Sequence, residues 1–154
     1  MADPASHEPV GKVVAIQGQA TVESAAGGRP LQLDSPVYAK DVIATGPGST
    51  LEIRFVDDSV FSQGPSAKMT VDSYVFDPAA KAGANMLLNL AQGTFRTVTG
   101  EIAKSNPDGV KLQTPLATIG IRGTGVDFDI APDGSEKYGI FQYDNLDLVI
   151  STPQ

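Results

Sequence analysis

Short apolar segments separated by turn residues are the feature that most constrains the fold of this chain. In residues 50–55, Leu51, Ile53 and Phe55 alternate with polar neighbours, so a strand would place all three on one face. Comparable segments recur about every ten residues, bounded by glycine and proline. This pattern predicts an all-β fold: a single-domain, β-sandwich-like stack of many short, mostly antiparallel strands, with at most one short helix.

The expected strands cover most of the chain. They are residues 12–17, 20–23, 31–34, 41–45, 50–55, 59–62, 69–71, 74–76, 86–90, 110–113, 126–130, 138–141 and 146–150. Gln92 and Gly93 are expected to end the strand at 86–90, residues 95–98 fit either a strand or a helical face, and one helical turn is expected at 101–104. The residues expected in the core are Leu51, Ile53, Phe55, Leu88, Leu90, Leu112, Ile119, Ile121 and Phe128.

Length and charge narrow the class of protein. At 154 residues the chain fits one domain, with residues 1–10 as a flexible leader, 11–150 as the β domain and 151–154 as a tail. The net charge is −7 and no run of Lys or Arg occurs, which argues against binding to nucleic acid or to an anionic membrane. No apolar run reaches the ~18 residues of a membrane-spanning helix, and residues 1–9 lack the apolar core of a secretion signal. We therefore expect no direct membrane insertion of this segment.

The sequence offers no catalytic or metal-binding constellation. It contains no cysteine and a single histidine, His7 in the polar leader, so neither a Ser-His-Asp triad nor a His- or Cys-rich metal site can be assembled. Asp57 and Asp58 fit a tight hairpin turn, whereas Asp127 and Asp129 are expected in solvent, flanking a buried phenylalanine. Calcium would need six or more oxygen ligands, roughly, and no ligand-rich loop supplies them. We expect no enzyme activity, no cofactor and no bound metal.

A glycine-rich stretch, TPLATIGIRGT, occupies residues 114–124. It resembles a phosphate-binding loop only superficially, because neither the helix nor the Lys-Ser/Thr pair of such a loop follows. Leu116, Ile119 and Ile121 are expected to supply core contacts, while the glycines let neighbouring strands approach closely. Arg122 is expected either to be fixed by carboxylate or carbonyl groups of the fold or, with Thr124, to contact a partner.

Together with three upstream segments, this stretch gives the chain a resemblance to a known family. The segments are GKVVAIQGQATVE at 11–23, KDVIATGPGSTLEIRFVDDSVFSQGPSAKMTVD at 40–72 and LLNLAQGTFRTVTG at 87–100. In this order they resemble the FecR-type domain of bacterial envelope proteins, over about residues 11–150. The resemblance implies a non-enzymatic all-β module with a structural family signature, formed by Thr114, Pro115, Ala117, Gly120, Arg122, Gly123 and Thr124.

The same resemblance implies a place in the periplasm or at the bacterial cell surface, and a protein partner in the cell envelope, either an outer-membrane channel or a signalling receptor. The favoured interpretation is the N-terminal retention module of a large type I-secreted adhesin. The alternatives are a periplasmic signal-relay domain of a FecR-like sigma-factor regulator and a carbohydrate-binding β-sandwich, which the 6% share of aromatic residues and the lack of Trp disfavour.

Adhesins of this type are released by a periplasmic cysteine protease that cuts at paired alanines followed by glycine. Residues 24–27 (SAAG) match by letter but lie in an early hairpin, and residues 78–81 (PAAK) lack the glycine. Both segments are therefore expected to be plain turns.

Overall fold

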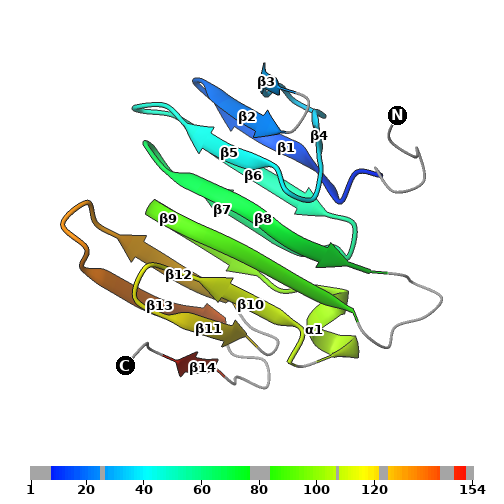
Figure 1. The fold of residues 1–154 in the computed structure, drawn as a ribbon, viewed down its shortest axis with the longest axis vertical. Coiled ribbons are helices and arrows are strands. Elements are labelled where there is room, and N and C mark those ends of the chain that lie inside the picture. The colour runs from blue at the N-terminus through cyan, green and yellow to red at the C-terminus, as the bar shows by residue number, and fades with distance from the viewer. Residues whose placement is uncertain are drawn as a thin grey trace.

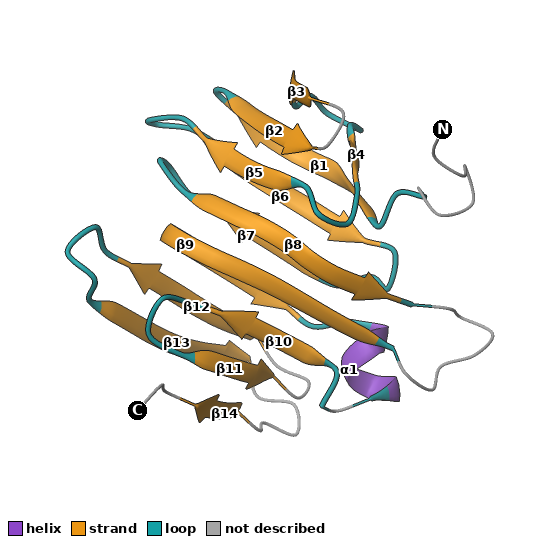
Figure 2. Ribbon diagram, viewed as in Figure 1, coloured by secondary structure: helices purple, strands orange, loops and turns teal. Residues whose placement is uncertain are grey.

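The computed structural model of the chain describes residues 8–24, 27–76, 84–106, 108–121, 125–142 and 148–151. Within these ranges the chain forms β-strands in two stacked layers, with one short helix, α1 (Glu101–Ser105), at one end (Figure 1 and Figure 2). The all-β prediction is confirmed, and so is the helical turn predicted at 101–104. No helix in the same ranges is long and apolar enough to cross a membrane.

The two layers share β9 and are otherwise made of different strands. Layer A contains, in spatial order, β4 (Pro36–Val37), β1 (Gly11–Gln17), β6 (Thr50–Phe55), β7 (Val60–Gln63), the C-terminal part of β9 (Asn85–Val98), β12 (Gly125–Ile130) and β13 (Glu136–Gln142). Layer B contains β3 (Gly27–Pro30), β2 (Ala20–Ser24), β5 (Val42–Thr45), β8 (Lys68–Val75), the N-terminal part of β9, β10 (Val110–Gln113), β11 (Thr118–Ile121) and β14 (Leu148–Ser151). Among these strands only β9 and β10 pair in parallel, so the prediction of mostly antiparallel strands is confirmed.

A bend at Gly93 carries β9 from one layer to the other. Residues 85–92 pair with β8, whereas residues 93–98 pair with β12. Gly93 has a φ of 113°, and a Cβ placed on it would lie 2.3 Å from the Cβ of Ala67. Only glycine fits such a backbone at such close approach. The prediction that Gln92 and Gly93 end the strand is therefore wrong: the glycine bends a 14-residue strand that continues through residues 95–98.

The core lies between the two layers. All of the residues predicted there, from Leu51 to Phe128, are buried. The rings of Phe55 in layer A and Tyr74 in layer B stack with their centroids 5.2 Å apart, which joins the layers directly. Period-2 alternation thus identified the inward-facing side chains correctly.

Alternation gave a wrong prediction at residues 31–34. Leu31 is buried, but Leu33 is 60% exposed and the segment forms a turn instead of a strand. Asp34 has a φ of 68°, which ends any extended conformation, and the Gln32 N–H donates to Ser35 Oγ at 2.8 Å. A local side-chain-to-backbone bond of this kind competes with strand pairing.

Candidate functional site

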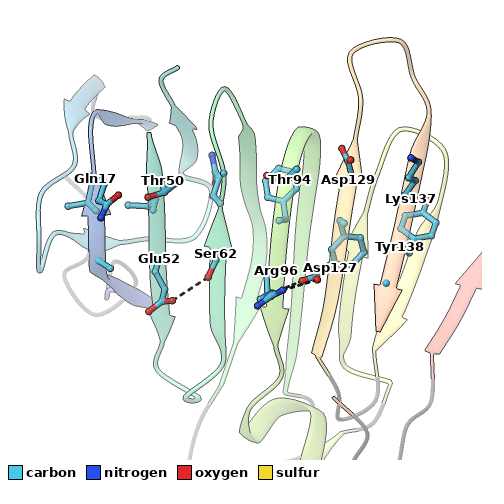
Figure 3. A pocket seen from close by; sticks show the side chains of 18 residues that line it. Gln17, Thr50, Glu52, Ser62, Thr94, Arg96, Asp127, Asp129, Lys137 and Tyr138 are labelled. Carbon is cyan, nitrogen blue, oxygen red and sulfur yellow. Dashed lines mark hydrogen bonds and ion pairs between the residues drawn. The ribbon is translucent and has the colours of Figure 1, made fainter. Parts of the chain in front are cut away.

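The outer face of layer A is hollowed into an open trough of about 790 Å³ (Figure 3). This surface, the layer A face, runs across β1, β6, β7, β9, β12 and β13. Because side chains alternate between the two faces of each strand, the polar residues that line it, such as Glu52 and Arg96, alternate with buried core residues. Apolar atoms, among them those of Ile16, also line the trough. The trough is therefore a direct product of the strand pattern.

Strand register aligns a row of polar groups across this face. Glu52 on β6 is opposite Ser62 on β7, Ser62 is opposite Arg96 on β9, and Arg96 is opposite Asp127 on β12. The Ser62 hydroxyl donates to Glu52 Oε1 at 3.4 Å. Figure 3 shows this row, with Asp129 and Lys137 in the neighbouring row on β12 and β13. These residues are far apart in the sequence, so only the sheet brings them together.

Arg96 and Asp127 form a two-point ion pair at the centre of the row. Arg96 Nε lies 2.6 Å from Asp127 Oδ1, and a terminal guanidinium nitrogen lies 3.0 Å from Oδ2. The hydrogen bond to Asp127, followed by the charge of that carboxylate, raises the pKa of Arg96. Both side chains are largely exposed, so the pair adds little to stability and mainly fixes the orientation of the guanidinium.

The layer A face is suited to recognition through hydrogen bonds and charges. Two cationic donors, Arg96 and Lys137, lie on this face. Three anionic acceptors lie there with them: Glu52, Asp127 and Asp129. In the described parts of the chain, no three His, Cys, Asp or Glu side chains are placed to hold a metal ion. A face with mixed charges fits the polar surface of a macromolecule better than a small, strongly charged ligand.

The signature stretch is visible only in part. Thr114, Pro115, Ala117 and Gly120 are described, whereas Arg122, Gly123 and Thr124 lie outside the described residues. The predictions that Arg122 is held by the fold or, with Thr124, contacts a partner therefore stay predictions.

The first half of the signature is a tightly bonded turn between β10 and β11. The Thr114 N–H donates to the Ala117 carbonyl at 2.8 Å, and Thr114 Oγ1 accepts the N–H of Ala117 at 3.0 Å. Thr114 is buried, and its hydroxyl donates to Glu136 Oε1 on β13 at 2.5 Å. The threonine thus joins a turn of layer B to a strand of layer A.

Glu136 completes this link between the layers. Its Oε2 accepts the Leu116 N–H at 3.1 Å, and its Oε1 also accepts the hydroxyl of Tyr138. Partial burial, followed by the bond to Glu136, raises the pKa of Tyr138, whose ring packs edge-on against Phe128. On its inner side, β13 thus holds the signature turn through the hydrogen bonds of Glu136. On its outer side, it contributes Lys137 to the layer A face.

Leu116 does not contribute to the core as predicted. It is 49% exposed, at the outer corner of the turn, whereas Ile119 and Ile121 on the following strand are buried. The physical reason is that Thr114 and Ala117 turn inward to close the turn, which leaves the two residues between them on the outside. The prediction of a core contact is therefore wrong for Leu116 and right for Ile119 and Ile121.

Asp57 is the residue whose role the sequence did not reveal. Its turn position is as predicted, but the side chain is fully buried. Asp57 Oδ1 accepts the Tyr74 hydroxyl at 2.6 Å and the Ser59 hydroxyl at 2.5 Å, while Oδ2 accepts the Ile102 N–H at 3.1 Å. The carboxylate thus joins the β6–β7 turn, β8 and the start of α1. An aspartate two residues before a serine is a local turn signal, but nothing local predicts partners at residues 74 and 102.

Comparison with known proteins gives one match. A protein-family model described as "FecR protein" matches residues 41–138. No curated protein matches the chain, and no solved structure matches it. The matched region begins before β5 and ends within β13, so it includes the Asp57 turn, all of β9, the signature stretch and most of the layer A face.

Proposed function

Since the chain belongs to the FecR protein family, whose model matches well over half of its length, we propose that it is a non-enzymatic extracytoplasmic interaction module of a bacterial envelope protein. More specifically, we propose that it is the N-terminal retention module of a large type I-secreted adhesin. In this role it would fold in the periplasm and hold the adhesin at an outer-membrane channel, the protein partner, without a cofactor.

The continuity of β9 through both layers supports this proposal best. β9 pairs with β8 and β10 in one layer and with β7 and β12 in the other. Because one continuous strand belongs to both layers, β9 links them covalently, and freeing either layer from it would break the two ladders on that half of the strand. A body that resists separation in this way can hold a chain at a pore by its bulk and stability.

The test compares the cell-surface level of the adhesin with the melting temperature of the module. Phe61 is buried between the layers, so Phe61→Ala should cost about 3–5 kcal/mol and lower retention in parallel. Asp129→Asn, on the exposed face, is the matched control and should change neither quantity. Arg122→Ala should impair retention only as far as it lowers the melting temperature.

A loss of retention at an unchanged melting temperature in Arg122→Ala would contradict retention by bulk. The loop at residues 79–84 is expected to be exposed, but Ala84, its one described residue, is buried, so the expectation is wrong there. Substitutions at residues 79–83, which lie outside the described residues, should be tolerated. If such substitutions abolished retention while the module stayed folded, a specific receptor contact would replace the proposed mechanism.

The layer A face favours signal relay as the second candidate function. A relay domain needs a surface that recognises a partner, and the row from Glu52 to Asp127 provides oriented charges for that purpose. Arg96→Ala would then abolish signalling at an unchanged melting temperature. In the adhesin, the same substitution should leave retention intact, so this variant separates the two functions.

A further inference from the structure

At one end of the molecule, the two layers differ in the number of strands that follow β9. Layer A continues with β12 and β13, whereas layer B continues with β10, β11 and β14. In the described part of the chain, β14 therefore lies one strand position beyond β13 and no strand of layer A faces it (Figure 1). At the other end the layers match, strand for strand, out to β3 and β4.

The strand edges at the two ends also differ in chemistry. β3 has four residues and β4 has two, and they contain Pro30 and Pro36, which have no N–H to offer. Short edge strands and prolines are devices that prevent another strand from adding to a sheet. β13 has seven residues, contains no proline and pairs only with β12 among the described strands. β14, the edge strand of layer B at the same end, also lacks proline but has only four residues. Of the four described edge strands, β13 is therefore the longest and best keeps the features of an edge that accepts a strand.

The hydrogen-bond pattern shows which groups of β13 face outward. The Ala131 N–H donates to the Ser135 carbonyl at 2.9 Å, which makes this pair the hydrogen-bonded pair next to the turn. Hydrogen-bonded and non-bonded pairs alternate along an antiparallel ladder. Lys137 and Gly139 therefore bond to β12, whereas the backbone groups of Glu136, Tyr138 and Ile140 point toward the open edge.

We propose that the β13 edge accepts one extended strand from a partner polypeptide, which adds antiparallel to β13 and covers β14. Side-chain contacts fix this edge in advance, because Glu136 is bonded to the signature turn and Tyr138 packs against Phe128. A strand that binds a pre-ordered edge gains main-chain hydrogen bonds at little ordering cost.

A second copy of the chain does not fit this edge in place of a single strand. If two β13 strands paired, the β11 of the second copy would have to lie opposite its own β13, in the strand position that β14 of the first copy occupies. A single strand without a second layer avoids this overlap. The β13 edge therefore has room for a single peptide strand but not for a second two-layered domain.

The chemistry of the edge defines the strand that it accepts. Lys137 points to the outer side, so an acidic residue opposite it is favoured, while the alternate residues face inward over β14 and should be apolar. β12 already pairs with β13 in this way, since Asp129 is opposite Lys137 and the intervening residues of β12 are buried. Its sequence, GVDFDI, is therefore a suitable probe.

The test titrates the intact chain with a capped synthetic GVDFDI peptide and follows backbone amides by NMR and hydrogen exchange. The amides of Tyr138 and Ile140 should shift and exchange more slowly, whereas those of Lys137 and Gly139, already bonded to β12, should keep their exchange rates. A control peptide, GVKFKI, should bind several-fold more weakly, about threefold for each opposed charge pair. Lys137→Glu is exposed and should reverse this preference without loss of folding.

Three results would overturn the proposal. One is protection of the Tyr138 and Ile140 amides in the chain without peptide, which would mean that the edge is already paired. Another is loss of protection at Lys137 and Gly139, which would mean that the peptide displaces β12. The third is an absence of saturable shifts on β13 at millimolar peptide. None of these results bears on whether the parent protein is an adhesin or a relay protein, so the two proposals fail separately.

Discussion

At the scale of single residues, Asp57 joins three elements through one buried carboxylate. Asp57→Asn keeps the shape but replaces one acceptor oxygen by an amide N–H₂ donor, which then faces either the Tyr74 and Ser59 donors or the Ile102 N–H. A buried polar group that loses its hydrogen-bond partners destabilises the folded state. We therefore expect a loss of about 3 kcal/mol in the free energy of unfolding, measured in urea. Asp58→Asn is the matched control and should cost less than about 0.5 kcal/mol, because Asp58 is exposed. Equal losses in the two variants would show that the buried carboxylate is not the cause.

The Tyr74 hydroxyl predicts how stability changes in alkali. Burial, followed by the hydrogen bond to Asp57, raises its pKa above the ordinary value of 10.0. Above pH 10 the unfolded chain loses this proton and the folded chain keeps it, so stability falls as pH rises, by up to about 1.4 kcal/mol per pH unit. Tyr74→Phe should be less stable than the natural protein at pH 7, and the difference should narrow above pH 10. Parallel curves in pH-dependent urea melts would contradict this assignment.

At the scale of elements, β9 shows how a turn signal and a strand signal compete. Because glycine is usual in turns, the sequence predicts that the strand ends at Gly93, whereas this glycine bends the strand past Ala67. Gly93→Ala should cost about 3 kcal/mol or more, because backbone strain and overpacking add. Gly48→Ala also has a positive φ but meets no atom within 4 Å, so it should cost only about 1 kcal/mol. Ala67→Gly should relieve only part of the Gly93→Ala loss, because the Ala67 Cα would still lie 2.8 Å from the new Cβ. No relief at all would show that the contact with the Ala67 Cβ does not contribute to the loss.

At the scale of the whole molecule, the sequence was sufficient for the fold class and the core but not for the arrangement of strands. Alternation is a local property, so Leu51, Ile53 and Phe55 could be assigned to the inside without knowing their neighbours. Pairing is non-local: Arg96 meets Asp127 only because two distant strands share a register. The layer A face was therefore invisible to motif analysis, since each strand contributes one or two ordinary polar residues to it. The signature contains a turn that the sequence did not predict, and Glu136, which bonds to this turn, lies on a strand outside the motif.

The shared strand also has a consequence for the time at which this molecule can fold. β9 is flanked by β7 and β8, which precede it in the chain, and by β10 and β12, which follow it. The pairing of β9 is not complete until β12, which ends at Ile130, has joined it. Chains dominated by such distant pairings fold slowly, on the order of milliseconds to seconds. The first two thirds of the chain therefore cannot reach their final arrangement before the last third is available. In the proposed role, the module would fold only once β9, β10 and β12 have all reached the same compartment.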